Sequence, residues 1–220
     1  MSLITAIDPS RRREGRFELF VDGSHQATVS LDVIERLGLR VGLPFEPVAD
    51  AVAREAALLG TYDRALRMLA LRARARGELR RSLVQKGEPA DQVEAALDRL
   101  EAAGFLDDSA FARQFARSRS AGAGASRRRI QQELNRRGVA RQVTDEAIAE
   151  VYEEEAVDEE AVAVRAARKK LRSLAGLDPV VRNRRLYGYL ARRGFDAADI
   201  RNAIEVVTGE TPELEDAGGD

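Results

Sequence analysis

The sequence predicts a mainly helical, elongated protein of three tandem three-helix repeats, with a small β-hairpin-containing region at the N-terminus. Three stretches, ELRRSLVQKG, RRRIQQELNRRG and RNRRLYGYLARRG, align at the glycines that end them, Gly87, Gly138 and Gly194. The glycines are 51 and then 56 residues apart, which leaves room for about three helices in each repeat. Apolar residues recur eight and four positions before each glycine, and ten and thirteen positions after it. These columns hold Leu79, Ile130 and Leu186; Leu83, Leu134 and Leu190; Leu97, Ile148 and Ile204; and Leu100, Val151 and Val207.

A β-hairpin is predicted near the N-terminus. RFELFV, residues 16–21, alternates and is rich in strand formers, and HQATVS alternates again after Asp22 and Gly23. Glycine accepts the positive φ that tight hairpin turns require. Ser30 is a suitable N-cap for a short helix, LDVIERLGL, that stops at Gly38. Because so small a hairpin is marginal alone, we expect it to pack on this helix or on the first repeat.

The first repeat opens with helical periodicity. An apolar stripe runs over residues 49–70 with most arginines off it, and Gly77 is expected to break the helix. The second helix is predicted over 78–86, and the third from Pro89 to about residue 103.

The later repeats follow the same plan. A helix that carries Phe111 and Phe115 ends in SAGAGA, whose glycines are predicted to act as a hinge, and Ser126 caps RRRIQQELNRR. QVTDEAIAEVY completes the second repeat, and the third consists of a helix over 161–174, RNRRLYGYLARRG and ADIRNAIEVV. The predicted organisation is an N-terminal region (1–60), repeats over 61–108, 109–152 and 153–207, the last with an acidic linker, and a disordered acidic tail (208–220).

The residues that most enzymes need are scarce. The chain has no Cys and one His, His25, which lies in a turn-like DGSH segment and is expected to be exposed. GxxxxGK[ST] and HExxH are absent, and the acidic runs 107–108 and 158–160 fit helix caps and turns better than a divalent-ion site. We therefore expect no catalysis, no metal and no cofactor. With no 18-residue apolar run and no signal-peptide pattern, we expect a cytoplasmic protein that does not contact membranes.

Charge is segregated along the chain although the net charge is only −1. Residues 109–149 hold nine basic and three acidic residues, 150–160 hold seven acidic and no basic ones, and 161–207 hold eleven basic and four acidic ones. The last thirteen residues add five acids. Such blocks indicate surfaces that attract partners of opposite charge.

The basic clusters are the candidate binding residues, because runs of this kind neutralise phosphates or an acidic protein surface. They are Arg127, Arg128, Arg129, Lys169, Lys170, Arg172, Arg182, Arg184, Arg185, Arg192 and Arg193. The first three occupy the first turn of a helix, where positive charge opposes the helix dipole. A solvated face, or internal pairing with residues 153–160, is the alternative interpretation. Tyr189 could stack on a base or could pack as a half-exposed core residue.

A second hypothesis is a DNA-binding transcription regulator with RRRIQQELNRR as its recognition helix. Readers of base edges mix Asn, Gln, Ser and Arg in the first turn, whereas this turn is nearly all Arg. Phosphate or protein contact is therefore favoured over sequence readout. A third hypothesis is a repeat scaffold for other proteins.

Residues 104–139 resemble the RecX family of regulators of the RecA recombinase. The family pattern is a Gly-aromatic-Leu-Asp-Asp joint, a Phe-Ala pair, an arginine-bearing helix, a Gly-containing loop and an Ile-x-x-Glu-Leu-x-x-(Arg/Lys)-Gly helix. Here these are Gly104, Phe105, Leu106, Asp107, Asp108, Phe111, Ala112, Arg117, Arg119, Gly122 or Gly124, Ile130, Glu133, Leu134, Arg137 and Gly138. The resemblance covers about residues 60–207, and the N-terminal region is similar to the extension of longer members.

The resemblance implies a curved tandem of three-helix units that lies in the groove of a RecA filament on single-stranded DNA. There it would block filament extension, strand exchange, ATP turnover and the coprotease role of the filament, without being an enzyme itself. The expected partners are the RecA filament and single-stranded DNA, with double-stranded DNA as a second candidate, and the chain is expected to be a monomer. The family motif does not assign binding residues, so the arginines and lysines above rest on charge alone.

Overall fold

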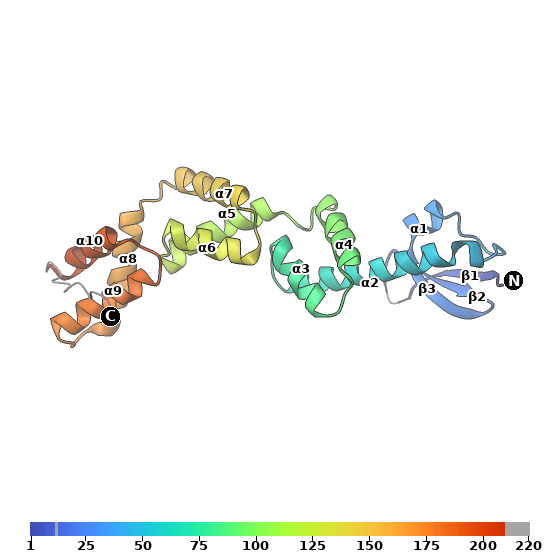
Figure 1. Ribbon diagram of the computed structural model, residues 1–220, viewed down its shortest axis with the longest axis horizontal. Helices are drawn as coiled ribbons and strands as arrows, with labels where there is room; N and C mark the ends of the chain where they lie inside the picture. The colour runs from blue at the N-terminus through green and yellow to red at the C-terminus, as the bar shows by residue number, and fades with distance from the viewer. Residues whose placement is uncertain (12, 210–220) are drawn as a thin grey trace. The chain divides into compact units, whose positions relative to one another are not determined.

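The computed structural model describes residues 1–11 and 13–209 as two compact units, Met1–Leu106 and a second unit that starts at Asp107 (Figure 1). Within these described residues, the first unit contains a three-stranded sheet and four α-helices, and the second contains six α-helices. Mainly helical repeats with a small β region are therefore confirmed as the fold class.

The first unit begins with an antiparallel sheet in the order β1-β2-β3. Its elements are β1 (Ile4–Pro9), β2 (Arg16–Val21), β3 (Ser24–Ser30), α1 (Leu31–Arg36), a 3-10 turn η1 (Glu46–Val48), α2 (Ala49–Leu71), α3 (Arg76–Gln85) and α4 (Ala90–Ala102).

The predicted hairpin is confirmed, but a third strand was missed. Asp22 and Gly23 both have positive φ, 48° and 78°, as a two-residue hairpin turn requires. The additional strand, β1, pairs with β2 through Ile7 opposite Leu19. Its sequence, ITAIDP, is short and ends in proline, so strand periodicity alone is a weak signal there. Ser30 stands at the N-cap of α1 as expected, yet its side chain makes no capping bond.

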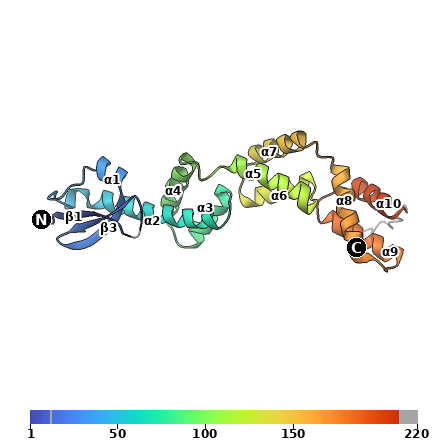
Figure 2. The same cartoon turned by 180° about the vertical axis from the view of Figure 1, so that it is seen from behind.

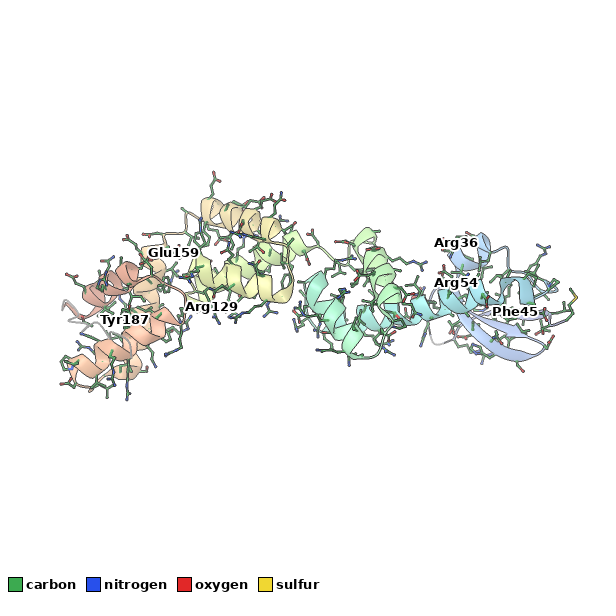
Figure 3. The ribbon with its side chains drawn as sticks, in the orientation of Figure 1. Arg36, Phe45, Arg54, Arg129, Glu159 and Tyr187 are labelled. Carbon is green, nitrogen blue, oxygen red and sulfur yellow. The ribbon has the colours of Figure 1, made fainter. Side chains whose placement is uncertain are left out.

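An ion-pair cluster ties the N-terminal region to the first repeat. Glu55 of α2 accepts from Arg36 of α1 at 2.6 Å and from Arg99 of α4 at 2.9 Å. Arg36 is labelled on α1 in Figure 3. Burial opposes ionisation of Glu55, but the two guanidinium groups outweigh it and hold the pKa of this carboxyl below its usual value. Helix α2 is continuous through residues 60 and 61, so the boundary predicted there falls inside one helix. Gly77 was expected to break a helix and instead lies within the first turn of α3.

The second unit holds the other two repeats. The second repeat consists of α5 (Asp108–Ser118), a π-helical turn η2 (Arg119–Ala123), α6 (Arg127–Arg137) and α7 (Arg141–Glu154). The third consists of α8 (Glu159–Leu171), a 3-10 turn η3 (Arg172–Leu174), α9 (Pro179–Ala191) and α10 (Ala197–Thr208). In every repeat the first helix packs chiefly on the third, α2 on α4, α5 on α7 and α8 on α10 (Figure 2).

The repeat pattern read from the sequence is the packing pattern of the helices. Every residue in the four apolar columns is buried except Val207, which is half-buried. The repeat glycines share one conformation, since Gly87, Gly138 and Gly194 have φ of 87°, 89° and 88°. L-residues rarely adopt such a φ, and it ends the second helix of each repeat. The predicted disordered tail, 208–220, lies outside the described residues from 210 onward, and α10 itself extends through Thr208.

We predict that Leu134→Ala destabilises the second unit by about 3 kcal/mol, because it empties a fully buried site in the core of the second repeat. The matched control is Val180→Ala, since Val180 is 72% exposed and its truncation should change stability by less than about 0.5 kcal/mol. Urea unfolding followed by circular dichroism measures both. Equal midpoints for the two variants would contradict the assignment of Leu134 to the core.

Candidate partner-binding surface

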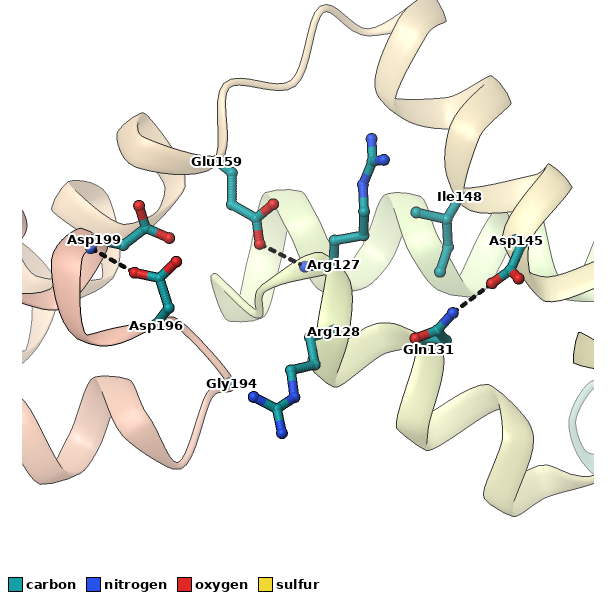
Figure 4. A pocket seen from close by; sticks show the side chains of 9 residues that line it. All are labelled: Arg127, Arg128, Gln131, Asp145, Ile148, Glu159, Gly194, Asp196 and Asp199. Carbon is teal, nitrogen blue, oxygen red and sulfur yellow. Dashed lines mark hydrogen bonds between the residues drawn. The ribbon is translucent and has the colours of Figure 1, made fainter.

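The first predicted cluster lies at the N-terminus of α6. Ser126 caps this helix, as predicted, because its Oγ accepts from the backbone N–H of Arg129 at 3.2 Å. The backbone N–H of Arg127 donates to Oε1 of Glu159 at 2.8 Å, and Glu159 belongs to the first turn of α8 (Figure 4). A carboxylate from the third repeat therefore supplies the negative charge that the arginine-rich first turn of α6 lacks.

Two of the three arginines in this turn have internal contacts. The Arg127 guanidinium lies 4.5 Å from the ring centroid of Tyr152, and Arg129 Nε pairs with Glu133 at 2.8 Å. Burial raises the pKa of Tyr152 to about 12; Glu159 adds to the rise and Arg127 opposes it. Arg128 is exposed and forms no ion pair within the described part of the chain. Arg129 is thus paired internally, but with Glu133 of its own helix and not with residues 153–160 as the alternative interpretation supposed; of that block, only Glu159 contacts this turn in the described chain, through the Arg127 backbone.

The second and third repeats interlock at two glycines. A Cβ at Gly194 would lie 2.6 Å from Ser126 Oγ and 2.9 Å from the Cβ of Arg129. A Cβ at Gly124 would lie 2.9 Å from the Cβ of Ala166 in α8. Gly124 is buried against α8, whereas Gly122 is exposed and a Cβ there would meet nothing within 4 Å, so the two glycines of the predicted hinge differ in packing. The motif alone did not reveal this, because Ala166 is far away in the sequence.

Three hydrogen bonds to backbone carbonyls complete the contact between the second and third repeats. Ser126 N–H donates to the carbonyl of Arg193 at 3.0 Å, and Arg193 Nη1 donates to the carbonyl of Gly124 at 3.5 Å. Arg165 Nη2 donates to the carbonyl of Ser120 at 3.3 Å. The turn between α9 and α10 is therefore held against the start of α6.

A cleft of about 570 Å³ opens beside this joint (Figure 4). Its lining includes Arg128 and Gln131 of α6, and Glu159, Asp196 and Asp199 of the third repeat. Burial, followed by the charges of Asp196, Glu159 and Glu160, raises the pKa of Asp199. The cleft carries both signs of charge, and within residues 1–11 and 13–209 no group of three acidic or histidine side chains could hold a metal ion.

Helix α9 carries the second predicted cluster. Arg182, Arg185, Tyr189 and Arg192 follow one another at spacings of three, four and three residues, so they share one side of the helix. Around Tyr189, the Arg193 guanidinium lies 4.5 Å and the Lys170 ammonium 5.8 Å from the ring centroid. We call Lys170, Arg182, Arg185, Tyr189, Arg192 and Arg193 the α9 face. The aromatic ring is half-buried between cations, which agrees with half-exposed packing.

Most remaining cations of the predicted site have no counter-charge. Lys169 is exposed on α8, Arg172 lies in η3, and Arg184 is exposed on α9. With Arg185 and Arg192, these residues form no ion pair in the part of the chain that the structure describes. The third repeat therefore has an excess of uncompensated positive charge.

The arginines of the second repeat differ, because the acidic linker compensates several of them. Arg113 pairs with Glu150 at 3.5 Å, and Arg117 pairs with Glu154 at 2.5 Å and with Glu155 at 3.0 Å. Residues 153–160 were predicted as possible internal partners of the basic clusters, but pairing with the arginines of α5 was not predicted. Glu159 and Gly194, which position the start of α6, were also not predicted as functional residues.

Matches to protein-family models cover all three repeats. The first three-helix domain of RecX matches residues 62–100, the second matches 107–148, and the third matches 158–204. The chain belongs to the RecX family. It is 36% identical over 148 residues to Regulatory protein RecX of Pelodictyon phaeoclathratiforme, covering 67% of this chain and 89% of that one. It is 40% identical over 168 residues to the Mycolicibacterium vanbaalenii protein of the same name, covering 73% and 88%.

Solved RecX structures share the fold. A crystal structure of regulatory protein RecX superposes with a TM-score of 0.73 at 23% identity, over 96% of this chain and 100% of the other. The crystal structure of RecX from Lactobacillus salivarius superposes with a TM-score of 0.55 at 17% identity, over 69% of this chain and 96% of the other. Among the described residues of this RecX-family chain, no helix is both long and apolar enough to span a bilayer.

We predict that Gly194→Ala destabilises the chain by at least about 2 kcal/mol more than Gly87→Ala does. Both glycines have almost the same φ, so both variants bear the same backbone strain, but a Cβ at Gly87 meets nothing within 4 Å. The difference between the two losses in unfolding free energy therefore measures the clash of the added methyl group with Ser126 and Arg129. Urea unfolding gives the two free energies, and equal losses would show that the joint tolerates a methyl group.

We predict that Asp199→Asn becomes relatively more stabilising as pH rises. A raised folded pKa means that the folded chain binds this proton more tightly than the unfolded chain, so ionisation of Asp199 costs stability above the ordinary value of 3.8. The stability of the variant minus that of the wild type should therefore increase from about pH 3 to about pH 7. A difference that stays constant across this range would contradict the raised pKa.

Proposed function

We propose that this chain is a non-enzymatic regulator of RecA. It binds the RecA filament on single-stranded DNA and inhibits filament extension, ATP hydrolysis, strand exchange and coprotease activity. The observation that carries the proposal is the uncompensated positive charge of the third repeat in a chain of the RecX family. The proposal includes a monomer in the cytoplasm, double-stranded DNA as a second ligand, and no cofactor.

Phosphate contact supports this proposal physically. Arg185 and Arg192 share one side of α9, and Arg184 is exposed on the same helix. These three arginines form no ion pair in the described chain. A polyanion that binds them therefore does not have to displace an internal acidic partner. Release of counterions from DNA makes such binding weaken steeply with salt.

The transcription-regulator alternative gains no support. In that hypothesis the first turn of α6 reads base edges, but the Arg127 side chain stacks on Tyr152 and Arg129 pairs with Glu133. The matched relatives carry the name Regulatory protein RecX. A base-reading role would require both side chains to leave their contacts.

The test titrates the chain into the cognate RecA on single-stranded DNA that RecA saturates, and follows ATP hydrolysis. We expect inhibition. Inhibition far below one chain per RecA indicates filament capping or propagated destabilisation, and inhibition only near equivalence indicates occupancy along the groove. No effect at any ratio would overturn the proposed function.

We predict that the variant Arg184→Ala, Arg185→Ala, Arg192→Ala raises the half-inhibitory concentration about tenfold and lowers the salt dependence of binding, because three phosphate contacts are lost. The fold should be unaffected, since these side chains have no internal ion pairs in the described chain. The matched control replaces three exposed, unpaired cations of the first unit, Arg54, Arg67 and Lys86, with Ala. Equal losses in both variants would mean that net charge matters and the third repeat does not.

A further inference from the structure

Two acidic segments flank the basic third repeat, residues 150–160 before it and residues 210–220 after it. In the acidic stretch 150–160, Glu150, Glu154 and Glu155 pair with arginines of α5. Glu159 accepts from the first backbone N–H of α6. Asp158 in turn caps α8, since its Oδ1 accepts from Glu160 N–H at 3.0 Å. Most acidic side chains of residues 150–160 therefore already contact groups within the second unit. The other segment, ETPELEDAGGD at 210–220, carries five acidic residues and no basic one.

The third repeat presents the matching excess of positive charge. Lys169, Arg172, Arg184, Arg185 and Arg192 form no ion pair within residues 1–11 and 13–209. Three of them are on α9 or in the turn that follows it. The acidic run 210–220 thus follows directly, in the sequence, after a repeat with five cations that have no ion pair in the described chain.

The acidic segment is long enough to reach them. Helix α10 ends at Thr208, follows α9 after a turn over 192–196, and packs on both α8 and α9. Eleven residues span up to about 36 Å when extended, whereas the thirteen residues of α9 span about 20 Å. Every cation along α9 is therefore within range of the segment.

We propose that residues 210–220 bind the cations of α9 and compete there with the phosphates of single-stranded DNA. The inference rests on the proposed function, in which α9 contacts those phosphates. Each exposed ion pair is weak, but the tether supplies the acidic residues at a millimolar effective concentration. The segment therefore acts as a built-in competitor that only a dense phosphate array, such as a filament, displaces.

The first experiment neutralises the segment without shortening it. The variant carries Glu210→Gln, Glu213→Gln, Glu215→Gln, Asp216→Asn and Asp220→Asn, and the probe is a fluorescently labelled single-stranded oligothymidylate. At low salt we expect the variant to bind about tenfold more tightly than the wild type, and the difference to vanish at high salt. Added to the background Arg184→Ala, Arg185→Ala, Arg192→Ala, the same neutralisation should change the affinity little.

A matched control separates the segment from net charge. It removes the same number of negative charges from exposed acidic residues elsewhere that have no ion pair in the described chain, by the substitutions Asp8→Asn, Glu35→Gln, Asp50→Asn, Asp91→Asn and Glu153→Gln. We expect this control to bind the oligothymidylate clearly more weakly than the neutral-segment variant does. Equal gains would overturn the proposal, because the effect would then belong to the charge of the whole chain.

A second measurement tests the contact without DNA. Amide resonances of α9 in the wild type and in the neutral-segment variant are compared at low and at high salt. We expect shifts around Arg185 and Arg192 at low salt only, and identical spectra would overturn the proposal. If no variant binds oligothymidylate, DNA contact in the proposed function fails, while the amide comparison still decides whether the segment binds α9.

Discussion

The close approach of the α9–α10 turn to the start of α6 is the contact on which the second unit depends. No side chain fits at Gly194, because Ser126 and Arg129 occupy the space that a Cβ would need. The same approach lets Ser126 bond the carbonyl of Arg193 while its hydroxyl caps α6. Glu159 then reaches the Arg127 amide and places a carboxylate at a helix end that is otherwise entirely basic. Two repeats are thereby joined through groups that each repeat alone would leave unsatisfied.

The arginines of the chain fall into two groups, those that contact acidic or aromatic side chains within the fold and those that form no ion pair in the described chain. Around α5–α7, guanidinium groups pair with the acidic linker or stack on rings; Arg119 and Arg137, for example, both lie 5.0 Å from the ring centroid of Phe115. In the first unit, Arg76 contacts Glu94, Asp98 and Glu101. The third repeat lacks such compensation at Arg184, Arg185 and Arg192 within the described chain. Charge that is uncompensated within a fold is costly at close range but attracts a partner of opposite sign.

The three repeats share one core plan and differ in how their surface charges are paired. Their helices pack through aliphatic residues, and the cleft beside Gly194 is lined by charged side chains of both signs. What distinguishes this chain is therefore the arrangement of charge on a helical scaffold. The proposed polyanionic partner rests on this charge arrangement in a chain of the RecX family.

The sequence by itself determined the repeats, because helical spacing and a glycine with positive φ are local properties. Leu83, Leu134 and Leu190 are fully buried at the positions that the alignment predicts. The cluster of cations on α9 could also be predicted from the sequence, since helical spacing alone places Arg185 and Arg192 on one side of the helix. β1 was missed because its strand signal is short. Only the tertiary structure decided which arginines are engaged and that Gly124 packs against α8. Those contacts join residues far apart in sequence, 32 positions for Arg127 with Glu159 and 69 for Arg193 with Gly124, and no local pattern encodes such a pairing.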